Sequence, residues 1–322
     1  MGMNFEPVAV ASAAAGAKLE VWQAAVLGLV EGITEYLPIS STGHLIVASS
    51  LMGLGETPEQ KHAVDGFNIV IQGGAILAVA GIFWPRVWGM LKGLVGKDPR
   101  GFLLACKLMV AFLPAMVLGL LLDDWLEERL FFPGPVVAAM LVGGVFMLLL
   151  DQWRNGRFGL RPRVPEVDVA DITWKQAFII GCFQCVAMWP GTSRSMMTIA
   201  GGVIVGLKPR QAAEFSFLLG LPTLGGATLL KLGKHPGLFR ELGVVPCLVG
   251  IAVATVSAFL AVRWLIGILN RWGLSPFGWY RLAAGTVLLV LVMRGTLTIA
   301  PDAKPELNTQ TDVVPWPKGS TP

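Results

Sequence analysis

The feature that most limits the fold of this chain is a series of apolar stretches, each close to the length of a membrane-spanning helix. Such a helix needs about 20 predominantly apolar residues. Hydrophobic residues make up 54% of the 322 residues and charged residues only 14%, against about 25% charged in soluble domains. We therefore predict an all-α polytopic membrane protein rather than a soluble enzyme. The stretches are Phe67–Trp84, Phe102–Leu122, Pro135–Leu150, Ala212–Leu230, Val244–Ile266 and Phe277–Met293.

Two further apolar regions are interrupted at their centres by a proline and a cluster of hydroxyl residues. Val21–Leu51 is broken at Pro38, and Trp174–Gly206 is broken at Pro190. Proline cannot continue a helix, and irregular backbone at membrane depth is tolerated only where protein buries it or it lines a wet cavity. We expect each region to form a re-entrant hairpin of two short helices with a polar tip. A single span with a proline kink is the alternative.

An internal repeat links the two broken regions and the helices that follow them. The matching positions, all 152 residues apart, are Trp22 and Trp174, Pro38 and Pro190, Ser41 and Ser193, and Gly73-Gly74 and Gly225-Gly226. We expect two repeats, residues 21–150 and 174–298, each made of one re-entrant hairpin and three transmembrane helices. They form a single membrane domain over residues 21–298, after an N-terminal extension (1–20) and before a polar C-terminal tail (299–322).

The charges of the loops predict the orientation of the chain. The loops Pro85–Gly101 and Asp151–Thr173 are rich in arginine and lysine and should be cytoplasmic, whereas the acidic segment Asp123–Glu128 should lie outside. The two repeats are then inverted, an arrangement typical of transporters, and their polar tips meet near the midplane. Both termini lie outside in this scheme. Three basic residues lie outside against the charge rule: Lys231, Lys234 and Arg240.

Two glutamates precede the first tip. Glu31 and Glu35 are four residues apart, so they share one face of a helix. Ionisable residues within apolar segments are expensive and indicate a functional site. Two carboxylates this close repel each other, which suits a divalent cation between them or one shared proton. Structural carboxylates that accept hydrogen bonds from the hairpin are the alternative.

The first tip itself carries Ser40, Ser41, Thr42 and His44. A serine hydroxyl is a poor nucleophile until a base takes its proton or a cation lowers its pKa. His44 lies three residues after Ser41 and would reach it if the tip turns into a helix there. A simple hydroxyl cap on the following helix is the alternative for the serines and the threonine.

The second tip carries an arginine among hydroxyl residues. An arginine at membrane depth needs an anion, and its planar guanidinium matches phosphate oxygens. The alternative is an internal salt bridge from Arg194 to Glu31 or Glu35. A continuous basic pore, as in an anion channel, is disfavoured because we count essentially one intramembrane arginine. The polar residues of this tip are Thr192, Ser193, Arg194, Ser195 and Thr198.

Together the two tips offer a nucleophile, a base, carboxylates and an anion-binding arginine, which is the equipment of phosphoryl transfer. The net charge of +4 is spread over short loops. Nucleic-acid binders carry dense basic patches, so we expect no nucleic acid as a partner.

Two segments of the chain resemble the signatures of the undecaprenyl-pyrophosphate phosphatases of the bacitracin-resistance type. The first runs from Glu31 to His44 and the second from Pro190 to Thr198. The resemblance extends over roughly residues 21–293, nearly the whole membrane part. The chain departs from the family pattern at Met196, where the family usually has glycine.

The resemblance implies an enzyme of the bacterial plasma (inner) membrane that removes the terminal phosphate of undecaprenyl pyrophosphate. This reaction recycles the carrier lipid for peptidoglycan synthesis and confers bacitracin resistance. It also implies a divalent cation, Mg²⁺ or Ca²⁺, a homodimer surrounded by bilayer lipids, and an active site that opens toward the periplasmic face.

The resemblance further implies a role for each site residue. Ser41 would be the nucleophile and His44 the general base or proton donor, although His44 could itself attack phosphorus. Glu31 and Glu35 would bind the cation or orient His44, and Arg194 would bind phosphate. The expected phosphate donors are Ser40, Thr42, Ser193, Ser195 and Thr198. A polyprenyl-phosphate transporter or flippase on the same scaffold is the alternative function.

Overall fold

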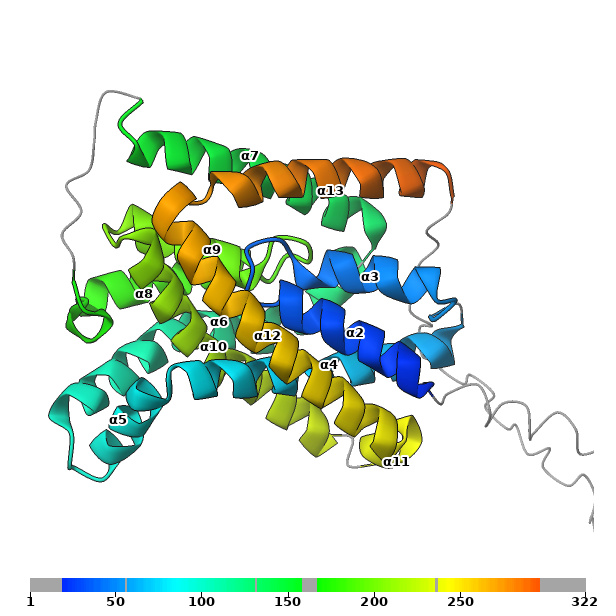
Figure 1. Cartoon of the computed structure of the whole chain (residues 1–322), viewed down its shortest axis with the longest axis horizontal. Helices are drawn as coiled ribbons and strands as arrows, with labels where there is room; N and C mark the ends of the chain where they lie inside the picture. The colour runs from blue at the N-terminus through cyan, green and yellow to red at the C-terminus, as the bar shows by residue number, and fades with distance from the viewer. Residues whose placement is uncertain (1–18, 56, 131, 158–166, 235–236, 296–322) are drawn as a thin grey trace, which may run out of the picture.

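The computed structural model describes residues 19–55, 57–130, 132–157, 167–234 and 237–295. In these residues the regular secondary structure is helical, with no strand (Figure 1). The expected N-terminal extension and C-terminal tail lie almost wholly outside them. The helices are α2 (Val21–Thr34), α3 (Ser41–Leu51), α4 (Pro58–Ile82), α5 (Trp84–Leu94), α6 (Pro99–Leu130), α7 (Pro133–Arg154), the 3-10 turn η1 (Val169–Asp171), α8 (Trp174–Val186), α9 (Arg194–Ile204), α10 (Pro209–Lys234), α11 (Leu238–Leu242), α12 (Val244–Trp272) and α13 (Ser275–Met293).

Six of these helices are long and apolar enough to cross a membrane: α4, α6, α7, α10, α12 and α13. They coincide with the six predicted stretches, so the prediction of a polytopic all-α membrane protein is confirmed. Two expected loops are helical instead. The acidic segment Asp123–Glu128 continues α6, and most of Pro85–Gly101 is divided between α5 and the start of α6. Gly93 and Gly101 allow α5 to lie against α6, because a Cβ on Gly93 would lie 2.3 Å from the backbone nitrogen of Phe102 and a Cβ on Gly101 would lie 2.1 Å from the carbonyl oxygen of Gly89.

Both regions with a central proline are broken into two short helices, as predicted. The first gives α2 and α3, and the second gives α8 and α9. In Figure 1 the two hairpins approach from opposite ends of the molecule and their tips meet in the middle. The proposal that the two halves derive from one repeated unit remains a prediction.

The single register of 152 residues expected for the repeat is wrong for the hairpins. The helices α2 and α8 begin at Val21 and Trp174, and the residues that precede α3 and α9 are Ser40 and Ser193. Each of these pairs is 153 residues apart in the chain. Matching tryptophans and prolines can coincide by chance, whereas the capping residues fix where a helix begins. The hairpins therefore correspond with one residue more than the sequence comparison indicated.

The first hairpin is fixed in the bundle by close contact between α2 and α12. A Cβ on Gly28 would lie 2.5 Å from the carbonyl oxygen of Gly250, and a Cβ on Gly32 would lie 2.0 Å from Oγ of Ser257. Only glycine allows the two backbones to approach this closely. This packing fixes the direction in which Glu31, in the last turns of α2, and Glu35, its C-cap residue, project toward the second hairpin.

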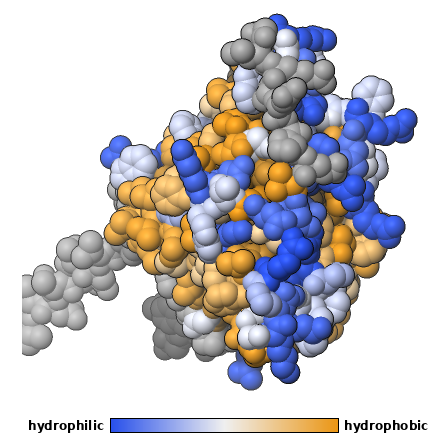
Figure 2. All heavy atoms as spheres, turned by 90° about the vertical axis from the view of Figure 1, so that its left-hand side faces the viewer, coloured by the Kyte–Doolittle hydropathy of each residue, from blue (hydrophilic) through white to orange (hydrophobic). Residues whose placement is uncertain are grey.

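The two basic loops lie at the same end of the molecule, as their charges predict. The guanidinium of Arg86 donates to Asp168 at 2.7 Å, and that of Arg100 donates to Asp171 at 2.7 Å. Figure 2, which faces this end, shows hydrophilic residues gathered over it and apolar residues around them. These ion pairs connect the segment before α8 to α5 and α6, and so position the second hairpin.

Candidate active site at the meeting point of the two tips

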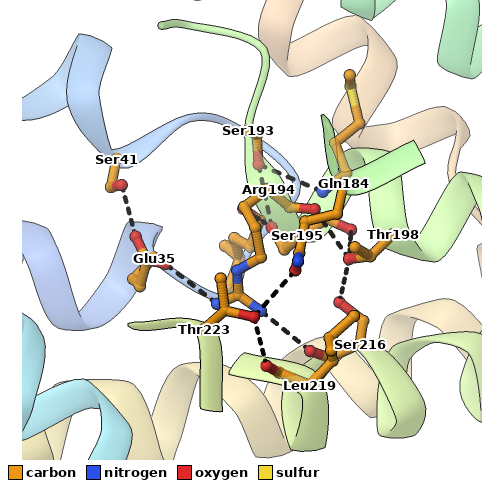
Figure 3. A network of polar contacts seen from close by, with 12 residues as sticks. Glu35, Ser41, Gln184, Ser193, Arg194, Ser195, Thr198, Ser216, Leu219 and Thr223 are labelled. Atoms are coloured by element: carbon orange, nitrogen blue, oxygen red, sulfur yellow. Dashed lines mark hydrogen bonds and ion pairs between the residues drawn. The ribbon is translucent and has the colours of Figure 1, made fainter. Parts of the chain in front are cut away.

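The tips of the two hairpins touch through side chains of the second tip (Figure 3). The hydroxyl of Ser195 donates to the carbonyl oxygen of Leu37 at 2.9 Å, and Nη2 of Arg194 donates to Oε1 of Glu35 at 3.1 Å. Ser195 is fully buried. The two halves of the predicted site, whose contacting residues are 158 and 159 residues apart in the sequence, therefore form one polar cluster inside the helix bundle.

Each tip turns into its second helix through a serine with a left-handed backbone. Ser40 has φ of 75° and Ser193 has φ of 74°, a region that disfavours residues other than glycine. The hydroxyl of Ser40 accepts from the backbone nitrogen of Gly43, and that of Ser193 accepts from that of Met196. The cap alternative raised for the first tip therefore holds for Ser40, and Ser193 caps the second helix of its own hairpin in the same way.

The carboxylate of Glu35 is the centre of the site. It accepts from the hydroxyl of Ser41 at 2.7 Å through Oε2 and from Arg194 through Oε1 (Figure 3). The side chains of Glu35 and Arg194 are only 6% and 11% exposed. The expected contact between Ser41 and His44 is not formed. The reason is geometric, because Ser41 begins α3 and its hydroxyl points back toward the end of α2.

His44 is held by two other partners. Its Nδ1 lies 2.7 Å from the carbonyl oxygen of Ser40, and its Nε2 lies 2.7 Å from the hydroxyl of Tyr280. The imidazole also stacks on the Tyr280 ring, with centroids 5.7 Å apart. The expectation that the glutamates orient His44 is therefore not met. Sequence reasoning missed Tyr280, and its only signal there is that it is one of two tyrosines in the chain.

Arg194 keeps its Nε donor available in this structure. Its Nη1 donates to the carbonyl oxygen of Ser216 at 3.0 Å, and the guanidinium lies 5.2 Å from the centroid of the Tyr36 ring. Its Nε is buried without a hydrogen-bond partner among the described residues. The salt bridge weighed as an alternative is thus present, to Glu35 rather than Glu31, and a donor remains for an anion.

The remaining hydroxyls of the second tip are bonded to one another and to α10. Ser193 and Ser195 lie 3.0 Å apart through their hydroxyl oxygens, and the Thr198 hydroxyl lies 2.6 Å from that of Ser216. Thr198 also donates to the carbonyl oxygen of Arg194 at 2.8 Å. These bonds stiffen the first turn of α9. On the first tip, Thr42 is half-buried and has no hydrogen-bond partner within the described part of the chain.

Glu31 is the strongest candidate cation ligand. It is 1% exposed, and its Oε2 has no hydrogen-bond partner in the described part of the chain. No group of three or more His, Cys, Asp or Glu side chains that could hold a metal occurs among the described residues. Mg²⁺ is commonly bound by one or two carboxylates together with substrate phosphates. Glu31 and Glu35 therefore fit a cation that substrate phosphate helps to bind.

A second buried arginine was missed. Arg281 is fully buried in α13, and its Nη2 donates to the carbonyl oxygens of Ala139 and Gly191 at 2.9 and 2.8 Å. The expectation of essentially one intramembrane arginine is therefore wrong. The rule used for Glu31 would have found Arg281, since it lies inside the predicted stretch Phe277–Met293. Its bond to Gly191 helps to hold the second tip.

The chain matches the family model described as "Bacitracin resistance protein BacA" over residues 24–287. It is 44% identical over 272 residues to "Undecaprenyl-diphosphatase" of Sorangium cellulosum (strain So ce56), covering 84% of this chain and 86% of that protein. It is 42% identical over 278 residues to "Undecaprenyl-diphosphatase" of Bacillus velezensis (strain DSM 23117 / BGSC 10A6 / LMG 26770 / FZB42), covering 85% of this chain and 98% of that protein. It is 45% identical over 276 residues to "Undecaprenyl-diphosphatase 2" of Rhodospirillum rubrum (strain ATCC 11170 / ATH 1.1.1 / DSM 467 / LMG 4362 / NCIMB 8255 / S1), covering 86% of this chain and 96% of that protein. With a match that spans both hairpins and most of the membrane helices, the chain belongs to the BacA bacitracin resistance family.

Proposed function

We propose that this protein hydrolyses undecaprenyl pyrophosphate to undecaprenyl phosphate and inorganic phosphate. The observation that carries the proposal is the array of Ser41, Glu35 and Arg194 at the meeting point of the two tips. A hydroxyl that donates to a carboxylate, which in turn accepts from a guanidinium, is the arrangement of an activated nucleophile beside an anion-binding site. The names of the relatives supply the substrate.

In this proposal Ser41 attacks the terminal phosphorus and Glu35 takes the hydroxyl proton. The bond from that phosphorus to the bridging oxygen breaks, undecaprenyl phosphate leaves, and a phosphoserine remains. Glu35 gives its proton to the departing lipid phosphate. Water then attacks the phosphoserine and passes a proton through Glu35 to the Ser41 oxygen, which releases inorganic phosphate and restores the hydroxyl. Arg194 balances the charge of the phosphate oxygens throughout, since a guanidinium matches them geometrically. Geometry thus supports Glu35 rather than His44 as the base for Ser41.

A divalent cation, Mg²⁺ or Ca²⁺, belongs to the proposal, with Glu31 and Glu35 as its ligands. Such a cation would neutralise charge on the diphosphate when it is bound. The buried, unpartnered oxygen of Glu31 supports this assignment. A carboxylate oxygen at that depth is costly unless it is paired with a cation or a donor.

His44 is the competing nucleophile. Its Nε2 would have to leave the Tyr280 hydroxyl to attack phosphorus, whereas Ser41 already lies against a base. A trapped phosphoenzyme decides between them, because phosphohistidine is hydrolysed in acid and phosphoserine is not. Acid-stable phosphate on the peptide that contains Ser41 would support the serine, and acid-labile phosphate on His44 would overturn it.

The cellular part of the proposal follows from the substrate. A six-span protein of this family acts in the bacterial inner membrane, recycles the carrier lipid for cell-wall synthesis and thereby confers bacitracin resistance. We place the opening of the site on the periplasmic side, because the first hairpin enters opposite to the basic loops (Figure 1). A homodimer is part of the same proposal.

The test is phosphate release from undecaprenyl pyrophosphate by the purified protein in detergent, with and without EDTA. Ser41→Ala and Arg194→Ala should each lose release, and EDTA should abolish it in the wild type. Thr286→Val is the control, because it also removes a hydroxyl from a membrane helix, but one that lies outside the site and donates within α13 to Leu282. A folded wild type that releases no phosphate would overturn the proposal and favour the transporter.

A further inference from the structure

Gln184 is a buried polar residue of the site that the motifs do not include. It lies on α8, is 2% exposed, and its Oε1 accepts from the hydroxyl of Thr223 on α10 at 3.2 Å (Figure 3). The single proton of that hydroxyl is shared with the carbonyl oxygen of Leu219, which accepts it at 2.8 Å. The amide nitrogen Nε2 of Gln184 is buried and has no hydrogen-bond partner among the described residues. Thr223 thus holds one end of the carboxamide while the other end is unmatched.

The position of Gln184 corresponds to that of Glu31 in the first hairpin. Both lie in the third turn of the first helix of their hairpin, and they are 153 residues apart, the register that the helix starts define. Each is almost fully buried, and each has one unmatched polar atom. The two hairpins therefore each supply one inward side chain from this level, a carboxylate from the first and a carboxamide from the second.

The unmatched atoms differ in kind in a way that identifies a ligand. Glu31 leaves an acceptor, whereas Gln184 and Arg194 each leave a donor, Nε2 and Nε respectively. A buried donor without an acceptor is destabilising, so a ligand that supplies acceptors to both donors removes that destabilisation. Gln184 and Arg194 both bond to the same stretch of α10, Gln184 through the Thr223 hydroxyl and Arg194 through the carbonyl oxygen of Ser216 (Figure 3). The ligand that fits two donors, one of them charged, is an anion with several oxygens.

We propose that Gln184 binds phosphate, donating from Nε2 to a non-bridging oxygen of the phosphate that Arg194 holds, and that Thr223 is the positioning residue that orients its carboxamide. The inference rests on the proposed function only for the identity of the lipid. The ligand chemistry, a phosphate, is shared by the diphosphate headgroup of the substrate and by the inorganic phosphate that hydrolysis releases.

The experiment has two arms, which separate the two sources of phosphate. One arm measures KM and kcat for undecaprenyl pyrophosphate, and the other measures protection of the protein from thermal unfolding by inorganic phosphate. Gln184→Met keeps the length of the side chain and removes the donor. A hydrogen bond to a charged group is worth about 1.5 kcal/mol or more. This variant should therefore raise KM, and the inorganic phosphate concentration that gives half-maximal thermal protection, by roughly tenfold or more.

Thr223→Val tests the positioning role. It should raise KM by roughly threefold, less than Gln184→Met, because the carboxamide loses its orientation and not its donor. Thr286→Val is the matched control, since the Thr286 hydroxyl donates only within its own helix, to Leu282. This control should leave KM and phosphate protection unchanged. A Thr223→Val variant indistinguishable from the control would overturn the positioning role.

Unchanged KM and unchanged phosphate protection in folded Gln184→Met would overturn the phosphate-binding role. If that variant fails to fold, Gln184→Glu replaces it, because a glutamate retains the shape and the oxygen that faces Thr223. A carboxylate there repels phosphate, so protection should fall further, and undiminished protection would overturn the inference. A wild type that binds inorganic phosphate but does not cleave the lipid would refute the proposed function while leaving Gln184 testable by the protection arm.

Discussion

Two glutamates one turn apart at the C-terminal end of α2 should respond in opposite ways to the same substitution. Glu35 accepts hydrogen bonds from Ser41 and Arg194, whereas Glu31 has a buried oxygen without a hydrogen-bond partner in the described residues. Glu35→Gln removes the counter-charge of a buried guanidinium. Glu31→Gln removes a buried charge that has no hydrogen-bonded cation beside it in the metal-free protein. The two variants are matched, because each makes the same substitution at a buried glutamate and the two positions are one helical turn apart.

The magnitudes follow from burial. Removing one partner of a buried ion pair costs about 3–5 kcal/mol, and the Glu35 and Arg194 side chains are only 6% and 11% exposed. Glutamine keeps one oxygen for Arg194, so we expect the lower end, about 3 kcal/mol. At roughly 2 °C for each kcal/mol in a chain of this size, the unfolding midpoint should fall by about 6 °C. Glu31→Gln should leave the midpoint equal to that of the wild type or raise it, because an unpartnered charge is no longer buried.

The assay is thermal unfolding in detergent with EDTA, followed by phosphate release with added Mg²⁺. Glu35→Gln should lower turnover by about 10²–10⁴, the range for loss of a general base. Glu31→Gln should instead need more Mg²⁺ for half-maximal activity. Equal midpoints for Glu35→Gln and the wild type would refute the argument from the buried ion pair. A Glu31→Gln midpoint as low as that of Glu35→Gln would refute the assignment of Glu31 as the unpaired carboxylate.

Three further predictions test the surroundings of the site. Tyr280→Phe removes the hydroxyl that holds Nε2 of His44. Turnover measured by steady-state kinetics should fall by roughly threefold to tenfold, as expected for the loss of one hydrogen bond. Turnover equal to that of the wild type would contradict a role for this contact. Arg86 donates to Asp168 and holds the pKa of that carboxyl below its ordinary value of 3.8. The stability from this pair is therefore present above about pH 4 and is lost as the pH falls through the lowered pKa. Unfolding midpoints measured from about pH 5 to 3 should fall less steeply in Asp168→Asn than in the wild type, and equal slopes would contradict the prediction. Gly32→Ala places a Cβ 2.0 Å from a hydroxyl oxygen of α12; overpacking of this kind costs about 1–3 kcal/mol, and an unfolding midpoint equal to that of the wild type would show that α2 and α12 can separate without cost.

Much of the fold was predictable because its determinants are local. An apolar stretch of about 20 residues identifies a helix that spans the membrane. A proline followed by hydroxyl residues interrupts a helix wherever it lies. These two facts identified the six spans and both broken hairpins. The extra helix α5 was not predicted, because its packing depends on Gly93 lying against α6.

The sequence alone determined which chemical groups line the site. Glu31, Glu35, Ser41 and Arg194 stand out because a charged or nucleophilic group within apolar sequence needs a reason to be there. The same rule, applied to every predicted span, would also have revealed Arg281.

Only the tertiary structure decided which of these groups are partners. Ser41 bonds to Glu35 rather than to His44, and His44 bonds to Tyr280, which is 236 residues away in the chain. Spacing in the sequence gives the face of a helix but not its rotation against a neighbour. That rotation is set by packing between distant helices, such as the glycine contacts of α2 with α12. The chemistry of the site is therefore local in origin, and its geometry is a property of the packed bundle.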